Sequence, residues 1–597
     1  MIERELRNQI ADVRAGRLSR RSFVQNMVAL GLTAPMAGVM LTQSGVAMAE
    51  TAFPYKEPPK AGGGAVRLLL WQAPTLLNPH FAVGTKDQEA CRLFYEPLAG
   101  WDQDGNLVPI LAAEIPTKEN DGLKEDGLSV VWKLKQGVKW HDGTPFTADD
   151  VVFNWEYAKN PETSAVSIGS YKDVRLVEKV DDHTVRMTFA EPTPFWADAF
   201  VSAYGQIIPK HLFAEFIGGK SREAPANLKP VGTGPYLFAD FKPGDTVLGK
   251  RNPSYHVAGR PYFDTIEMKG GGDAVSAARA VLQTGEYDYG WNMQVEDEIL
   301  QKLENGGQGK VSFVPTGNIE FIGLNFSDPN VEVEGQRAYY KTRHPLFSDP
   351  AVRAAINLLI DRASVQKFIY GRAGNATANF LNNPERFRSK STSFEFNIEK
   401  ANQILETAGW KKGSDGIRAK DGKPLRFVFQ TSINSPRQKN QAIIKQACQK
   451  AGIDVELKSV VGSVFFSSDT ANADTYSHFY CDAEMFQTTM TQPDPQFFMN
   501  QFVSTEVATK ENKWQGRNIS RWQNKDYDET YRLAQKELDP VKRAAMFIKL
   551  NDLVVTDNYI LPEINRRNCI GLKNGMVANK SGWDNDLWQI ASWYRET

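Results

Sequence analysis

Residues 134–157 read LKQGVKWHDGTPFTADDVVFNWEY, and three local structures are predicted along this stretch. Apolar residues alternate with lysines over most of 134–140, which predicts the end of a strand followed by a turn. Asp142-Gly143 predicts a tight turn, because Asp bonds its own backbone and Gly accepts a positive φ. Thr147 predicts a helix N-cap, with two aspartates beside the positive end of the helix dipole. These residues define a fold element and contain no pattern for catalysis.

The same stretch resembles the signature of the family 5 extracellular solute-binding proteins, the peptide, opine and nickel-binding group that serves ABC transporters. Further matches occur along almost the whole chain in the order usual for this family. They are YEPL at 95–98, VGTGPY at 231–236, GEYD at 285–288, DPAVRAAINLLID at 349–361, RWQN at 521–524 and YD at 527–528. The resemblance implies a two-lobe α/β periplasmic binding protein fold of type II, with an extra subdomain in the first lobe and a hinge between the lobes.

The length agrees with this implication, because 597 residues exceed what one hydrophobic core organises. By resemblance, lobe I is discontinuous and contains both ends of the mature chain. We predict lobe I over 50–95, 200–318 and 560–597, the additional subdomain over 96–199, and lobe II over 319–559.

Alternating strand and helix patterns predict an α/β region in each lobe. The elements predicted for the first lobe are a strand at 66–71, a helix at 86–95, a hairpin at 98–109, a helix at 274–282 and a strand at 287–291. Those predicted for the second are strands at 320–326, 425–430 and 453–460, helices at 351–360, 401–408, 438–450 and 541–555, and a return strand at 559–564.

The N-terminal 49 residues resemble an export signal. Arg20-Arg21 lies in a twin-arginine pattern, and a short apolar stretch follows over 27–41. Ala47 and Ala49 precede an expected cleavage site before Glu50. The alternatives are an amphipathic terminal helix or an uncleaved anchor. The sequence therefore favours a periplasmic protein exported by a twin-arginine signal, without a lipid anchor because no Cys stands at the cleavage point.

Composition and motifs argue against several other classes of protein. A net charge of −1 gives no footprint for nucleic acid. No G-x-S-x-G or H-E-x-x-H motif occurs, and Ala214 replaces the first Gly that a phosphate loop ending at 219–221 would need. The seven histidines are scattered, which disfavours nickel and other metals. We therefore predict no enzyme activity and no cofactor.

The four cysteines form no C-x-x-C pair, so metal and redox motifs are absent from the sequence. An oxidising periplasm permits one or two disulfides. Cys448 with Cys481 is the first pair to test, and buried free thiols are the equal alternative.

The candidate binding segment is FQTTMTQPDPQFF at 486–498, with Phe486, Thr488, Thr491 and Asp494 as the proposed contacts. By resemblance, peptide-binding relatives carry an Asp four residues before the last Pro, which accepts the ligand's α-ammonium, and a Trp seven residues before it. Here Thr491 and Thr488 take those two places. If the loop is shifted, Asp494 or Asp482 takes the place of the Asp that accepts the α-ammonium. The alternative is that Asp494 only caps the next helix.

Further candidate contacts follow predicted strands. They are Trp71, which ends the first strand, Asn78 in the loop after it, and Trp291 and Asn292 at the end of the strand at 287–291. Open α/β sheets place ligands beyond such strand ends. A structural role is the alternative for each, and for Trp71 the core is the better interpretation.

Three functional hypotheses remain open. The leading one is the periplasmic component of an ABC importer, a monomer that captures an oligopeptide or dipeptide and delivers it to an inner-membrane permease. The second is the same role for an oligosaccharide or opine, which the two threonines favour because neutral hydroxyls suit neutral polar ligands. The third is a periplasmic hydrolase or chaperone on the same scaffold, for which no residue pattern gives support.

Overall fold

The computed structural model describes residues 63–596 apart from Glu125, together with residues 8–10, 12–13, 23 and 26–27. The side chain of Pro540 is not described. The expected signal residues Arg20, Arg21, Ala47 and Ala49 lie outside the described residues. Within the described part of the chain, no helix has the length and apolar character needed to span a membrane.

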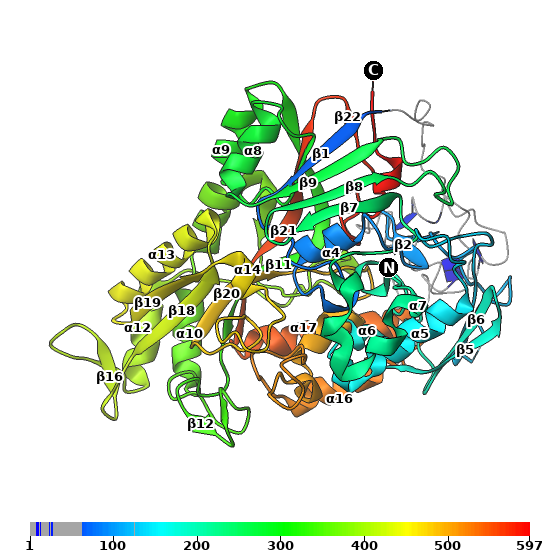
Figure 1. Ribbon diagram of the computed structural model, residues 1–597. Coiled ribbons are helices and arrows are strands. Elements are labelled where there is room, and N and C mark those ends of the chain that lie inside the picture. The colour runs from blue at the N-terminus through cyan, green and yellow to red at the C-terminus, as the bar shows by residue number, and fades with distance from the viewer. Residues whose placement is uncertain are drawn as a thin grey trace.

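An eleven-stranded sheet runs through the described residues and has two halves (Figure 1). The first half contains β10 (Tyr289–Gly290), β1 (Ala65–Leu70), β9 (Thr265–Gly270), β8 (Thr246–Arg251) and β7 (Tyr236–Lys242), in that order. The second half contains β19 (Asp454–Val460), β18 (Arg426–Ser432) and β20 (Ala483–Thr488). Between them lie β11 (Gly309–Leu324) and β21 (Ile560–Lys573), with β14 (Gly374–Ala376) paired to β21.

The two central strands join the halves. β11 and β21 are antiparallel partners, and β21 also pairs with β10 of the first half, whereas β11 also pairs with β20 of the second. Their register shifts between Pro315 and Ile319, where a bulge interrupts the ladder. The chain therefore passes between the sheet halves through two adjacent strands. The sequence predicted only the ends of these strands, at 320–326 and 559–564.

The signature segment is confirmed as a turn followed by a helix. Thr147 caps α5 (Ala148–Lys159) in a capping box with Asp150. The preceding strand, β4 (Ser129–Lys133), ends earlier than predicted and pairs with β6 (Thr184–Phe189) and β5 (Val174–Asp181) in a separate small sheet. His141 of the turn contacts the second matched segment at 231–236. Its backbone N–H donates to the Gly232 carbonyl at 2.8 Å, and its Nδ1 accepts from the Gly232 N–H at 3.1 Å.

Most predicted helices are confirmed. The Asp273 carboxylate accepts from two backbone N–H groups and caps α8 (Ala274–Leu282), which matches its predicted range. The strand–helix–strand prediction in the second half is also confirmed, because β18 and β19 are parallel neighbours joined through α13 (Ser435–Lys450). The remaining confirmed elements are the β2–β3 hairpin (Ala99–Trp101 and Leu107–Pro109), α10 (Pro350–Leu358), α12 (Ile398–Thr407) and α17 (Pro540–Thr556). The helix α4 (Thr85–Cys91) is shorter than predicted.

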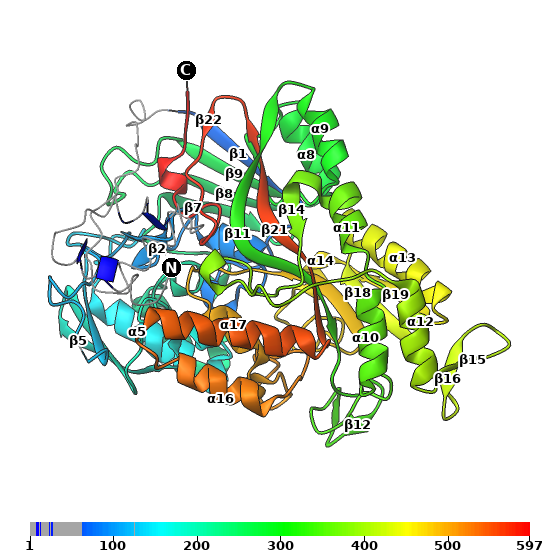
Figure 2. The same cartoon turned by 180° about the vertical axis from the view of Figure 1, so that it is seen from behind.

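Two C-terminal helices pack on the far side of the molecule. α16 (Lys525–Ala534), which the sequence analysis did not predict, packs against α17 (Figure 2). Lys536, in the connection between these two helices, forms an ion pair with Glu191, which follows β6. At the chain end, Arg595 pairs with Asp288 at 2.7 Å beside β1. All four cysteines are buried free thiols, so Cys448 and Cys481 are not bonded to each other.

Candidate binding cavity between the sheet halves

A cavity of about 180 Å³ lies between residues of the two sheet halves. One wall comes from the first half, from Gln72 after β1, from 83–88 around the start of α4, and from 291–294 after β10. The opposite wall comes from 466–478, from the end of β20 and the loop after it, and from 513–519. Strand ends and loops far apart in the sequence therefore converge on one partly open cavity.

The two walls touch each other around the cavity. Ser202 Oγ donates to the Thr491 carbonyl at 3.3 Å, and Arg222 donates to Ser468 Oγ at 3.1 Å. Lys172 pairs with Glu506 at 2.5 Å farther along the same seam. These contacts join residues more than 240 positions apart. Polar contacts therefore hold the two walls together along this seam.

Aromatic rings line both walls. On the first wall Trp291 is buried, with its ring centroid 6.2 Å from that of Trp71. On the second wall Phe486 lies 5.1 Å from Tyr476, and Trp514 lies 4.1 Å from His478. Such rings offer large apolar surface and stacking faces to a ligand. The cavity is therefore suited to a ligand with apolar or planar groups.

Neutral hydrogen-bonding groups make up most of the remaining lining. Threonine, serine, asparagine and glutamine side chains come from both walls, including Thr488, Thr491, Asn292, Gln294 and Gln487. His478 is neutral near pH 7, because burial lowers its pKa to about 4. Among the described residues, Asp469 is the sole carboxylate of the lining.

Comparison with known proteins identifies the chain. The model of the bacterial extracellular solute-binding proteins, family 5 (middle region), matches residues 106–510. The chain belongs to this family. The Bacillus subtilis oligopeptide-binding protein AppA is 29% identical over 412 residues, which cover 67% of this family 5 protein and 70% of AppA. The Pectobacterium atrosepticum glutathione-binding protein GsiB is 27% identical over 452 residues, covering 73% and 80%.

Solved structures share the fold of this family 5 protein. AppA in complex with a nonapeptide superposes with a TM-score of 0.77 at 24% identity, covering 91% of this chain and 100% of AppA. NikZ from Campylobacter jejuni, in complex with Ni(L-His), superposes with a TM-score of 0.75 at 22% identity, covering 89% and 100%. The two-lobe periplasmic binding protein fold and the role as solute-binding component of an ABC transporter follow from the family. The named relatives are binding proteins and not enzymes.

The structure brings five of the eight predicted contacts to the cavity. Phe486, Thr488, Thr491, Trp291 and Asn292 all belong to its lining. Phe486 and Thr488 are at the end of β20, where strand pairing with β11 fixes their position. Asn292 has a φ of 49°, a left-handed conformation that Asn tolerates better than most residues.

The other three predicted contacts lie outside the lining. Trp71 stands behind Trp291 and donates its Nε1–H to the Asn292 carbonyl at 2.9 Å. Asn78 is buried, caps the short helix Pro79–Phe81 and donates to Asn227 at 2.8 Å. Asp494 is buried in an ion pair with Arg543. Each has a structural partner that explains its position.

Asp482, the other acid considered as a substitute, also lies outside the lining. Its carboxylate accepts from the Val428 N–H at 2.7 Å and contacts His344 Nε2 at 2.9 Å. No described carboxylate therefore occupies the place of the ammonium-binding acid that the resemblance implied.

Sequence reasoning missed the part of the wall at 513–519. Lys513 and Trp514 have φ values of 51° and 54°, uncommon for residues with side chains. Gly516 lies so close to the neighbouring backbone that a Cβ would stand 2.4 Å from the Glu506 carbonyl oxygen. A glycine between two polar residues was the only sequence signal, and it does not by itself indicate a binding loop.

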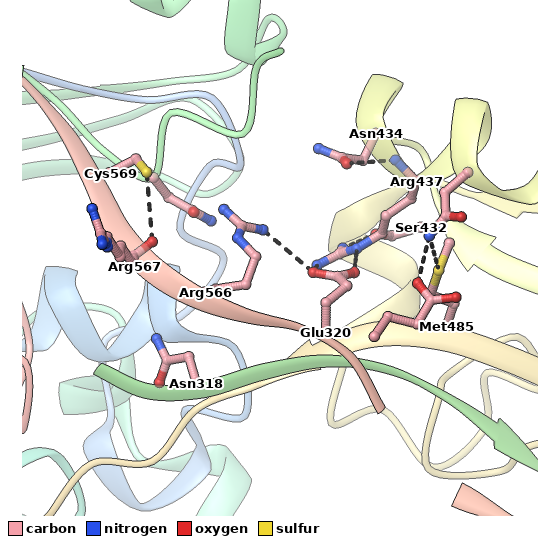
Figure 3. A network of polar contacts seen from close by, with 12 residues as sticks. Asn318, Glu320, Ser432, Asn434, Arg437, Met485, Arg566, Arg567 and Cys569 are labelled. Carbon is pink, nitrogen blue, oxygen red and sulfur yellow. Dashed lines mark hydrogen bonds and ion pairs between the residues drawn. The ribbon is translucent and has the colours of Figure 1, made fainter. Parts of the chain in front are cut away.

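A buried ion network lies behind the second wall (Figure 3). Glu320 of β11 pairs with Arg437 of α13 and, at 3.3 Å, with Arg566 of β21. Burial acts to raise the pKa of Glu320, but the two guanidinium groups outweigh it and hold that pKa below its usual value. Arg437 also lines the cavity and donates to Ser432 Oγ at 2.8 Å. The network thus ties the crossing strands to the cavity wall.

Proposed function

We propose that this protein captures a peptide between its two lobes and delivers it to an inner-membrane ABC permease. The observation that carries the proposal is the cavity between the two walls, with aromatic rings on both walls and neutral hydrogen-bonding groups between them. That lining suits peptide groups and apolar side chains. The names of the curated relatives, which are oligopeptide- and glutathione-binding proteins, support the same ligand class.

A hinge motion of the lobes gives the ligand access. We assign the hinge to β11 and β21, since these strands join the two sheet halves. The lobe boundaries predicted from the sequence, with lobe I at 50–95, 200–318 and 560–597 and lobe II at 319–559, belong to this proposal. Ligand that bridges both walls stabilises the closed form, which the permease then recognises.

The size of the cavity favours a short ligand. Its volume of about 180 Å³ is below the roughly 300–1,000 Å³ of pockets that hold drug-sized molecules. A dipeptide or tripeptide therefore fits the proposal better than a long peptide, which would hold the walls farther apart.

Further parts of the proposal concern the export route and the oligomeric state of the mature protein. We propose that the twin-arginine segment directs export to the periplasm, that cleavage follows Ala49, and that the mature chain acts as a monomer without catalytic activity or bound nucleic acid. The pattern around Arg20-Arg21 supports the export route.

A neutral or opine-type solute is the second candidate. It is favoured by Thr491, which stands where the resemblance implied an acid for the α-ammonium. Without that acid, a buried ammonium would lack a carboxylate at its usual place.

The test is a thermal-shift screen of residues 50–597 against mixed short peptides, opines and oligosaccharides. A ligand at 100 times its Kd adds about 2.7 kcal/mol to native stability. Stabilisation by the peptides is the expected result. Stabilisation by oligosaccharides or opines alone would overturn the peptide assignment.

A further inference from the structure

Positive charge is in excess in the cavity lining. Four lining side chains are cationic and one is acidic: Lys86, Arg437, Lys513 and Arg517, against Asp469. Two of the four cations are neutralised by acids behind the wall, since Asp87 pairs with Lys86 at 2.5 Å and Glu320 pairs with Arg437. The two that remain both come from the loop at 513–517.

Asp469 does not neutralise the positive charge of Lys513 and Arg517. Asp469 is exposed, and its Oδ1 accepts from the Ala471 N–H at 2.9 Å, so it supports its own turn. No ion pair joins it to a cation in the described part of the chain. Lys513 is exposed as well and reaches only the Glu162 carbonyl oxygen, at 3.4 Å.

Arg517 is the cation with unsatisfied hydrogen-bonding capacity. Its guanidinium Cζ lies 4.0 Å from the ring centroid of Phe497, while its Nε is buried and has no hydrogen-bond partner. It forms no ion pair with any described residue. A buried donor without an acceptor is costly, and a carboxylate is the acceptor that best matches the planar fork of an arginine.

Asp198 is a partly buried acid near this loop, and no ion pair joins it to Arg517 among the described residues. Its surroundings raise the pKa of Asp198 to about 7, although Arg517 acts to lower it. Asp198 instead accepts from Gln492 Nε2 at 3.4 Å and stands outside the cavity lining. The guanidinium of Arg517 is left for a partner that enters the cavity.

The loop that carries Arg517 is held in place by backbone hydrogen bonds. The Trp514 N–H donates to the Thr509 carbonyl at 2.8 Å, and the Asn518 N–H donates to the Glu506 carbonyl at 2.8 Å. Gly516 allows the close approach to the backbone at 506–507 that these bonds require. An anchoring residue on a fixed loop loses little freedom on binding.

We propose that Arg517 binds a carboxylate of the solute, so that the cavity selects ligands that carry a carboxylate. This inference rests on the proposed use of the cavity for solute capture and adds the chemical class of its ligand. Thr491 fits the same selection, because an acid at that position would place negative charge in the space that the carboxylate enters. The carboxylate can come from the C-terminus of a peptide or from an opine-type acid.

The test compares two tripeptide mixtures of identical sequence, one with free C-termini and one with amidated C-termini. Calorimetric titration into residues 50–597 should give at least tenfold tighter binding for the free-acid mixture. Arg517→Gln should remove that preference, and Arg517→Lys should retain part of it, because a lysine keeps the charge and loses the fork. Arg337→Gln is the matched control, since Arg337 lies 4.9 Å from the ring centroid of Tyr480 and outside the lining.

Equal binding of both mixtures, or an unchanged preference in Arg517→Gln, would overturn the inference. Opine-type acids serve as a separate arm. If they bind in an Arg517-dependent way while neither peptide mixture binds, the proposed peptide function fails and the anion inference stands. If neutral oligosaccharides bind and neither acid class does, the anion inference fails.

Discussion

The ion network at Glu320 and the loop at Arg517 are neighbours of the same cavity, and they differ in how their charges are paired. In the network, one carboxylate holds two guanidinium groups within the protein. In the loop, Arg517 lacks such a carboxylate. Arg437 and Arg566 are therefore expected to stabilise the fold, whereas Arg517 is expected to bind a ligand. The predictions below test this difference.

Removing the shared carboxylate of the network should have the largest effect. Glu320→Gln keeps the side-chain volume but leaves Arg437 and Arg566 without a counter-charge, which should lower the free energy of unfolding by about 3–5 kcal/mol. Urea titration measures the loss. Glu334→Gln is the control, because its pair with Lys341 is exposed to solvent and should contribute little to stability. Equal losses in the two variants would contradict the structural role of the network.

Asp494→Asn tests whether Asp494, like Glu320, stabilises the fold by pairing with a buried arginine. It leaves Arg543 buried with a neutral partner and should lower the unfolding free energy by about 3 kcal/mol. Because Asp494 is outside the cavity, the loss should be the same with and without saturating ligand. A loss that grows when ligand is present would mean that Asp494 contributes to binding.

Glu563→Gln tests a buried acid of β21 that borders the network. Burial raises the pKa of Glu563 to about 7, so the folded state holds its proton more tightly than the unfolded state. The wild-type protein should therefore lose about 2 kcal/mol of stability at this residue between pH 5 and pH 8, as pH rises through the folded pKa. Glu563→Gln should be close to wild type at pH 5 and more stable at pH 8. Parallel pH profiles of the two proteins would show that Glu563 titrates normally.

Thr491→Asp should have the smallest effect and concerns the cavity alone. The new carboxylate would repel an anionic ligand, which should weaken binding of free-acid peptides by about 1 kcal/mol, or roughly fivefold. Thr491→Asn keeps the shape without the charge and should bind nearly as the wild type does. Tighter binding by Thr491→Asp would indicate a ligand bound through its ammonium group.

The sequence predicted the fold best where local signals agreed with tertiary packing. α8 was predicted over its whole length from its apolar residues, and in the structure Asp273 caps its start. β21 was predicted only to residue 564, because the polar run Asn565–Asn568 does not look like a strand. In the structure the Arg566 side chain is buried against Glu320, a partner 246 residues away. Patterns along the chain do not contain such long-range pairing.

Part of the candidate site could also be predicted from the sequence, and the rest depended on long-range contacts. Phe486 and Thr488 were candidates because they belong to the segment at 486–498, and both line the cavity. They lie in β20, a strand that the sequence analysis did not predict. Asp494 was a candidate by residue type, and only its contact with Arg543 shows why it is unavailable to a ligand. Arg517 lies in a loop without periodicity, so its place in the wall depends on the folded backbone.

A crystal structure of the protein with the tightest-binding free-acid tripeptide tests the central claim most directly. The account predicts the peptide between Trp291 and Phe486, enclosed by both walls, with its carboxylate at hydrogen-bond distance from the guanidinium of Arg517. A peptide bound outside this cavity, or bound inside it with its carboxylate away from Arg517, would contradict the account.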